Sequence, residues 1–407
     1  MGKLNMFAIT FSNPQGVFYG GQLIQGHVTV ELNAEIKMRG IRLHFEGGAR
    51  VHWTETKSEG TGKDSRTVTE HYSSSETYFK HILVLFGKGP GQKGTDPVLQ
   101  AGRYVYPFSY QLPSGIPSSY ESSDGQVRYS VTGVIDRPWK FDHKTKRAYT
   151  VVDPLDLNQE PQAKQGEIRN GQKTLCCLCC KSGPISCMLR LDRLGYVPGE
   201  AIPITGEIIN GSRRNMTCSF ADIKMIVKYH ATSKTKTENK IVSKISHGPI
   251  LPGDSDTWNG DLLPIPPLPP SGLRGCRIID ITYRLALNVD PSGIAFDLVV
   301  PINILIGSIP LRSVARQYGP PRPLPLPPLG SNEMPLQPTM PSAPSNMDIP
   351  PPSYAECVFG KVNIRDENDD EHTRGNMNYA PVYSYYNWNQ HEANTFVPVT
   401  EQQQNRH

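Results

Sequence analysis

The stretch "IDITYRLALNVD", residues 279–290, decides the fold class of this 407-residue chain. Its odd-numbered positions are all apolar, and its even-numbered positions are polar or small. Side chains of a β-strand point alternately to the two faces of a sheet, so this pattern places one face in a core and the other in water. The stretch therefore predicts a half-buried β-strand.

Similar patterns occur along the first 310 residues, and no convincing long helix accompanies them. "QVRYSVTGVID" (126–136) begins with the same alternation until Gly133 shifts its phase, which suggests a bulge. Further strand candidates are "IRLHFEG" (41–47), "YFKHILVLFG" (78–87), "IKMIVKYHAT" (223–232) and "NKIVSKIS" (239–246). Many short strands separated by Gly and Pro predict an all-β protein built from sandwiches.

The sequence also repeats itself. Residues 19–32 resemble residues 195–210, and residues 112–136 resemble residues 268–290. Two copies of one β domain explain this better than a single large domain. The sequence predicts a first sandwich at 1–155, a linker at 156–184, a second sandwich at 185–310 and a tail at 311–407.

The first copy is the longer one. Gly21 and Gly199 are 178 positions apart, whereas Tyr129 and Tyr283 are 154 apart, so the first copy has 24 extra residues. The polar stretch 54–76 is the natural place for them. Because it is poor in apolar residues, it predicts a mobile loop.

The tail differs in composition from the two domains. Residues 320–352 contain 13 prolines, and proline removes a backbone donor, so this segment predicts a disordered, polyproline-rich tail. The acidic run "RDENDDEH" (365–372) is expected to stay extended and unstructured. The chain has 42 basic and 38 acidic residues, of which 7 basic and 10 acidic residues lie from Leu311 onward. The remaining body therefore has 35 basic and 28 acidic residues.

This charge balance and the absence of motifs exclude several classes of protein. The basic excess is too small for a dedicated nucleic-acid binder, but it is compatible with an anionic membrane surface. No signal peptide, membrane span, nucleophile elbow, phosphate loop or metal-ligand pair is visible. We therefore expect a cytoplasmic protein that is not an enzyme and uses neither cofactor nor metal.

Several motifs in their order resemble the alpha-arrestins, the arrestin domain-containing proteins. They are the two "Tyr…Gly-Gln/Glu" openings, "KTLCCLCCKSGPIS" (173–186), "TWNGDLLPIPPLPPS" (257–271), "ITYRLALNVD" (281–290) and "LVVPINILIGSIPL" (298–311). The resemblance implies two tandem arrestin-like, immunoglobulin-type β-sandwiches. It also implies an adaptor that brings HECT-type ubiquitin ligases to membrane receptors or transporters. One family member binds thioredoxin through a cysteine that residues 253–257 lack, so thioredoxin binding is not expected here.

The motif Pro351-Pro352-Ser353-Tyr354 fits the PPxY consensus bound by WW domains. The prolines preset the backbone for an aromatic slot, and the tyrosine ring fills a second pocket. Pro381 and Tyr383 form a degenerate second motif, because Ala380 replaces the first proline. We expect Tyr383→Ala to weaken binding less than Tyr354→Ala, and only when the partner carries more than one WW domain. The alternative for both motifs is chance similarity within the tail.

Three further sets of residues have both a functional and a structural interpretation. Arg322, Leu324, Pro325 and Pro328 fit a Src-homology-3 ligand, or belong to a spacer. Cys176, Cys177, Cys179 and Cys180 are candidates for palmitoylation or metal binding, or form a buried cluster. Six lysines are candidate ubiquitin acceptors, and the alternative is that they belong to a solvated charged face: Lys224, Lys228, Lys234, Lys236, Lys240 and Lys244.

The leading hypothesis is an adaptor that promotes cargo ubiquitination, endocytosis and endosomal sorting, and that is recruited from the cytoplasm to the plasma membrane and endosomes. Peripheral membrane association is compatible with the basic body. The alternative is a trafficking or signalling scaffold of the same fold that needs no ligase.

Overall fold

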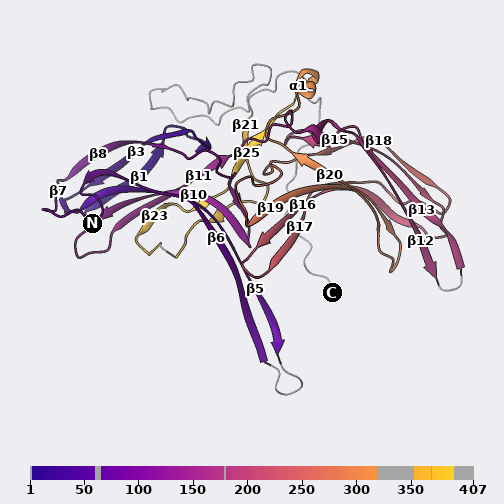
Figure 1. Ribbon diagram of the computed structural model, residues 1–407, viewed down its shortest axis with the longest axis horizontal. Coiled ribbons are helices and arrows are strands. Elements are labelled where there is room, and N and C mark those ends of the chain that lie inside the picture. Colours follow the sequence, from indigo (N-terminus) through magenta and orange to yellow (C-terminus); the bar gives the residue numbers. More distant parts are fainter. Residues whose placement is uncertain (1, 60–65, 178–179, 319–352, 368, 389–407) are drawn as a thin grey trace.

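Two β-sandwiches lie side by side in the computed structural model, as Figure 1 shows, and the all-β prediction is confirmed. The structure describes residues 2–59, 66–177, 180–318, 353–367 and 369–388. The stretch that predicted the fold lies in β19 (Ile279–Pro291), where every odd-numbered residue from Ile279 to Val289 is buried.

The first domain packs a three-stranded sheet against a larger one. The smaller sheet has the order β1 (Leu4–Phe11), β3 (Leu23–Leu32), β8 (Gly102–Gln111). The larger has the order β2 (Val17–Tyr19), β11 (His143–Val152), β10 (Gly125–Asp136), β5 (Gly40–Glu59), β6 (Arg66–Gly87), with β9 (Tyr120–Glu121) beside β10. A separate pair joins β4 (Ile36–Lys37) to β7 (Val98–Leu99).

The second domain repeats this plan. One sheet has the order β12 (Glu167–Cys177), β13 (Cys180–Leu191), β15 (Ala201–Asn210), β18 (Ser255–Pro264). The other has the order β14 (Gly195–Tyr196), β20 (Leu298–Ile306), β19, β16 (Met216–His230), β17 (Thr235–Ser246). The described helices are short, η2 (Pro161–Lys164) and α1 (Arg312–Tyr318), and neither could span a membrane.

Equivalent residues of the two copies have the same structural role. The buried hydroxyl of Tyr129 donates to the carbonyl of Pro117 at 2.6 Å, and that of Tyr283 donates to the carbonyl of Pro269 at 2.7 Å. Gly21 and Gly199 both have a positive φ, 79° and 94°, as glycine readily allows in a tight turn. The sequence repeat is therefore a repeat of structure.

The polar stretch 54–76 differs from the mobile loop expected. Outside residues 60–65, it forms the ends of β5 and β6, a long hairpin that projects from the first domain in Figure 1. Cross-strand pairs such as Trp53 on Tyr72, with centroids 5.5 Å apart, stabilise it. The prediction failed because Thr, Tyr and Val favour strands even where neighbouring residues are polar.

Two other expectations also differ from the structure. Most of the expected linker belongs to the second domain, because β12 pairs with β13 from Glu167 to Cys177. Gly133 causes no bulge, since β10 pairs continuously with both β5 and β11. A Cβ atom at Gly133 would lie 2.9 Å from the ring of Phe7, so the glycine permits a close approach between sheets instead.

The two domains meet where β10 and β19 begin. The hydroxyls of Tyr120 and Tyr229 lie 3.0 Å apart and are buried. Around them, ion pairs join Asp153 to Arg274 at 2.9 Å and Asp124 to Lys236 at 2.7 Å. This combination of buried rings and peripheral charges holds the domains together.

Candidate functional site

Part of the tail lies between the two domains as paired strands, although the sequence predicted a disordered tail. Residues 353–367 and 369–388, called the docked tail below, form β21 (Ser353–Glu356), β22 (Val362–Asn363), β23 (Thr373–Asn376), β24 (Asn378–Tyr379) and β25 (Val382–Tyr385). β21 pairs with β25 between the two sandwiches, and β23 extends the large sheet of the first domain (Figure 1).

The two tyrosine motifs of the tail are brought together. The backbone of Tyr354 pairs with that of Ser384, and Ala355 pairs with Tyr383. Pro351 and Pro352 lie outside the described residues, as do the side chains of Ser353 and Tyr354. The second half of the WW motif is therefore a strand in this conformation rather than a free peptide.

Tyr383 of the degenerate motif is an anchor of the docked tail. Its side chain is 2% exposed, and its hydroxyl donates to the carbonyl of Ser119 in the first domain at 2.9 Å. Burial raises the pKa of Tyr383 well above its usual value. A WW domain cannot reach a ring in this position, so the motif is not available as a ligand while the tail is docked.

Tyr386 makes the matching contact with the second domain. Its hydroxyl donates to the carbonyl of Ser308 at 2.9 Å, and its backbone nitrogen donates to the carbonyl of Pro198 at 3.0 Å. Its ring stacks on Trp388 in a small cluster that includes Val314 of α1. Tyr383 and Tyr386, three positions apart, thus connect the two domains.

The acidic run 365–372 is not unstructured as expected, within the residues described. Lys146 of β11 is 4% exposed and contacts Asp366 at 2.5 Å and Asp369 at 2.8 Å. Beside it, Lys144 contacts Asp370 at 3.3 Å. Because β23 pairs in parallel with β11, the strand edge and the lysines together hold the run in place.

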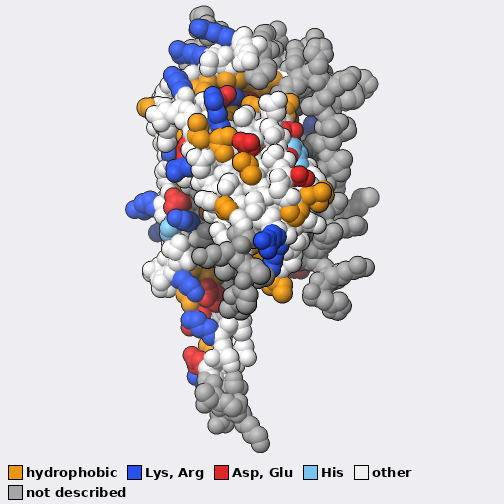
Figure 2. All heavy atoms as spheres, turned by 90° about the vertical axis from the view of Figure 1, so that its right-hand side faces the viewer, with side chains coloured by type: hydrophobic (Ala, Val, Ile, Leu, Met, Phe, Trp, Pro, Cys, Tyr) orange, Lys and Arg blue, Asp and Glu red, His pale blue; other side chains and the backbone are white. Residues whose placement is uncertain are grey.

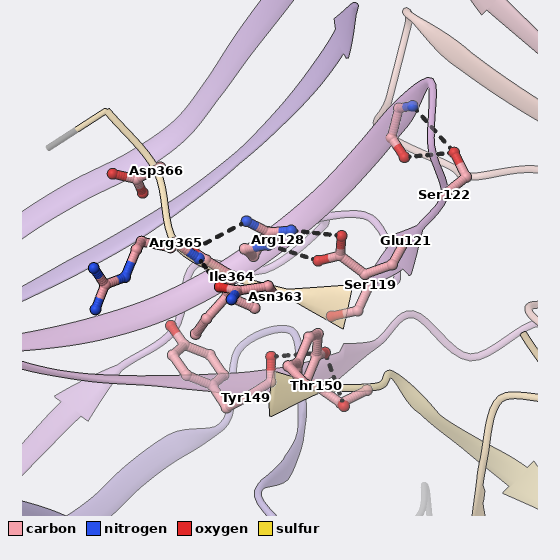
Figure 3. A network of polar contacts seen from close by, with 12 residues as sticks. Ser119, Glu121, Ser122, Arg128, Tyr149, Thr150, Asn363, Ile364, Arg365 and Asp366 are labelled. Atoms are coloured by element: carbon pink, nitrogen blue, oxygen red, sulfur yellow. Dashed lines mark hydrogen bonds and ion pairs between the residues drawn. The ribbon is translucent and has the colours of Figure 1, made fainter. Parts of the chain in front are cut away.

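A polar network fastens the middle of the docked tail, as Figure 3 shows. Arg128 binds both carboxylate oxygens of Glu121, at 2.6 and 2.7 Å, and also donates to the carbonyl of Ile364 at 3.4 Å. The hydroxyl of Thr150 accepts from the backbone nitrogen of Val382 at 3.2 Å and lies 3.1 Å from the hydroxyl of Tyr379. The first domain therefore recognises the tail through fixed, largely buried polar groups.

The lysine candidates lie along β16, β17 and the turn between them, on both faces of the strand pair, because Lys240 is paired with the buried Met225 but Lys224 with the exposed Ile241. Lys228, Lys234, Lys240 and Lys244 are exposed, whereas Lys224 and Lys236 are half-buried beside Asp222 and Asp124. Lys240 and Lys244 lie over the rings of Phe359 and Phe220, each at 3.7 Å. Both the acceptor interpretation and the charged-face interpretation remain compatible with these positions.

The remaining candidates fall partly or wholly outside the described residues. Arg322, Leu324, Pro325 and Pro328 lie outside them, and so does Cys179. Cys176, Cys177 and Cys180 are described by backbone alone, at the tip of the β12–β13 hairpin at the outer end of the second domain. Figure 2 views the molecule from this end, where hydrophobic side chains show between Lys and Arg side chains.

Within the part of the chain that the structure describes, no group of three or more His, Cys, Asp or Glu side chains is placed to hold a metal ion. Sequence reasoning missed the docked tail because its partners in the first domain lie more than 200 residues away. A usable signal was present, since tyrosine and tryptophan are concentrated at residues 379–388. Such a concentration of large rings is unusual in a solvated segment.

Two tandem sandwiches that hold a tail strand between them define the class of this protein as arrestin-like. The family model for the N-terminal domain of arrestin, or S-antigen, matches residues 7–158, and that for the C-terminal domain matches residues 181–311. The chain is 33% identical to arrestin domain-containing protein 17 of Caenorhabditis elegans over 76% of its own length and 72% of the relative's. It is 31% identical to arrestin domain-containing protein 4 of Mus musculus, over 78% of its own length and 75% of the relative's. The chain belongs to the arrestin domain-containing proteins, the alpha-arrestins.

Proposed function

We propose that this protein is a non-enzymatic adaptor that links membrane-protein cargo to HECT-type ubiquitin ligases with WW domains. The observation that carries the proposal is the position of Pro351–Tyr354, a sequence that fits the PPxY consensus, follows two arrestin domains and overlaps the start of the docked tail. The domains would hold a receptor or transporter, and the motif would hold the ligase. Cargo ubiquitination, endocytosis and endosomal sorting would follow, at the plasma membrane and endosomes.

The strand pairing of the motif within the docked tail suggests a condition for binding of the ligase. A WW domain needs the proline pair and the tyrosine ring together in an extended peptide. Because Tyr354 also pairs with Ser384, WW binding would compete with the β21–β25 contact. Recruitment of the ligase would therefore require that β21 leave β25.

The test is a binding assay between the full chain and isolated WW domains. Tyr354→Ala should abolish binding, whereas Tyr354→Phe should retain most of it, because the ring fills the pocket. In cells, Tyr354→Ala should also reduce ubiquitination of the chain itself at the exposed lysines of β16 and β17. Equal binding by the wild type and Tyr354→Ala would instead favour a scaffold that works without a ligase.

A further inference from the structure

The loop between β10 and β11, residues 137–142, exposes two aromatic side chains. Trp139 is 98% exposed and Phe141 is 72% exposed. The other three tryptophans of the chain, Trp53, Trp258 and Trp388, are buried with at most 5% exposure. Such exposure of a tryptophan is costly in water, so this loop requires a different explanation from the rest of the surface.

The loop is held in an unfavourable backbone conformation. Trp139 has a φ of 61°, and it is the one residue other than glycine with a positive φ in the described part of the chain. Positive φ is rare for bulky residues, and strained backbone of this kind is enriched at functional sites. The guanidinium of Arg137 donates to the carbonyl of Phe141 at 2.8 Å, and Asp142 accepts from the backbone nitrogen of Arg137 at 2.9 Å. These contacts close the loop and leave both rings outside.

The loop lies at the outer end of the first domain. β10 starts at Gly125, against Tyr229 of the second domain, and ends at Asp136. At about 3.3 Å per residue, its twelve residues carry the chain roughly 40 Å from the domain junction. The docked tail reaches only the edge of the loop, where the rings of His372 and Phe141 are 5.2 Å apart. Trp139 therefore stays accessible even with the tail docked.

The charges within the loop favour an anionic partner. Arg137 and Lys140 are its basic residues, and Asp142, which accepts from the backbone nitrogen of Arg137, is its one acidic residue. Lys144 is paired with Asp370, but Lys140 is exposed and forms no ion pair with any described residue. Two protruding rings offer far less than the roughly 800 Å² per partner of a stable protein interface. Rings flanked by cations do suit the boundary between lipid headgroups and acyl chains.

We propose that the loop 137–142 inserts Trp139 and Phe141 into the headgroup region of an anionic membrane, with Arg137 and Lys140 at the lipid phosphates. The site would hold the first domain on the bilayer that contains the cargo. This contact is reversible, because two rings and a few cations give weak adhesion. It depends on neither the WW motif nor the ligase.

The experiment measures binding of the full chain to vesicles of neutral lipid alone and of neutral lipid mixed with phosphatidylserine. Binding should be stronger with phosphatidylserine and should weaken as salt is added. The double variant Trp139→Ser/Phe141→Ser should bind at least about tenfold more weakly. Leu262→Ser is the matched control, because Leu262 is 52% exposed on β18 of the other domain. Its binding should equal that of the wild type.

Fluorescence gives an independent readout from Trp139, because the other tryptophans are buried. Vesicles should shift the emission to shorter wavelength and shield it from iodide, and brominated lipid should quench it. The Trp139→Phe variant should lose these changes while still binding. Unchanged vesicle binding by the double variant, or full iodide quenching of Trp139 on saturated vesicles, would overturn the proposal and assign the loop to a protein partner.

Discussion

Gly125, the first residue of β10, lies against a tyrosine ring of the other domain. A Cβ atom at this position would be 2.8 Å from the ring of Tyr229 and 3.1 Å from the side chain of Ile279. We expect Gly125→Ala to lower the free energy of unfolding by about 1–3 kcal/mol, because the junction must separate to admit the methyl group. Denaturant unfolding of the full chain measures this. Gly248→Ala is the control, with nothing within 4 Å of the added atom, and an equal loss there would contradict the explanation.

His247 gives the second domain a pH-dependent contact. Its ring stacks on Trp258 with centroids 3.8 Å apart, and its nitrogens lie 2.9 Å from Asp256 and 3.4 Å from Asp261. Partial burial lowers the pKa of His247, but the two carboxylates outweigh burial and raise the pKa above its usual value.

A histidine with a raised pKa in the folded state stabilises the fold fully below its unfolded pKa of about 6.5, and this stabilisation is lost as pH rises through the folded pKa. Thermal unfolding should therefore show a fall in Tm above about pH 6.5 that His247→Gln lacks. Identical pH profiles for the two proteins would show that another group is responsible.

At the scale of elements, β23 depends on a lysine beneath it. Lys146 and Asp369 are each 4% exposed, so the pair is shielded from solvent. Removing one member of a buried ion pair costs about 3–5 kcal/mol, because the other charge is left without a partner. We expect Lys146→Met to release β23, which hydrogen exchange at residues 373–376 would detect as faster exchange.

The matched control for that change is Lys140→Met. Lys140 is exposed on the neighbouring loop and has no ion pair among the described residues, so exchange at β23 should not change. If hydrogen exchange at residues 373–376 stayed slow in Lys146→Met, the backbone pairing with β11 would be sufficient to hold β23 without the ion pairs.

At the scale of the whole molecule, the docked tail changes what Tyr383 is expected to do. The sequence alone predicted that Tyr383→Ala would weaken WW binding less than Tyr354→Ala does, and only with a partner that carries more than one WW domain. Because the ring is buried and anchors β25 against the first domain, the structure predicts the reverse for the full chain. Losing the ring should free β21 and strengthen WW binding several-fold, whereas a peptide of residues 345–388 should show no such gain. A weaker full-chain complex would restore the original interpretation.

How much the sequence determined depends on the distance over which each interaction acts. Alternation in residues 279–290 identified β19, because strand periodicity is a property of adjacent residues. The repeat identified two domains, and Tyr129 and Tyr283 have equivalent contacts in both. The WW motif could be proposed from four consecutive residues, since a short extended peptide needs no fold to be recognised.

Only the tertiary structure showed that part of the tail docks on the two domains and that charged residues within it form ion pairs. The sequence predicted an extended, unstructured run around Asp366 and Asp369, because their partner Lys146 is 220 and 223 residues away and no local pattern indicates such a pairing. For the same reason the sequence predicted that Tyr383 belongs to a degenerate WW motif, although its side chain is buried and anchors the docked tail. Local periodicity fixes strands in the sequence, but burial and charge pairing depend on which distant surfaces meet.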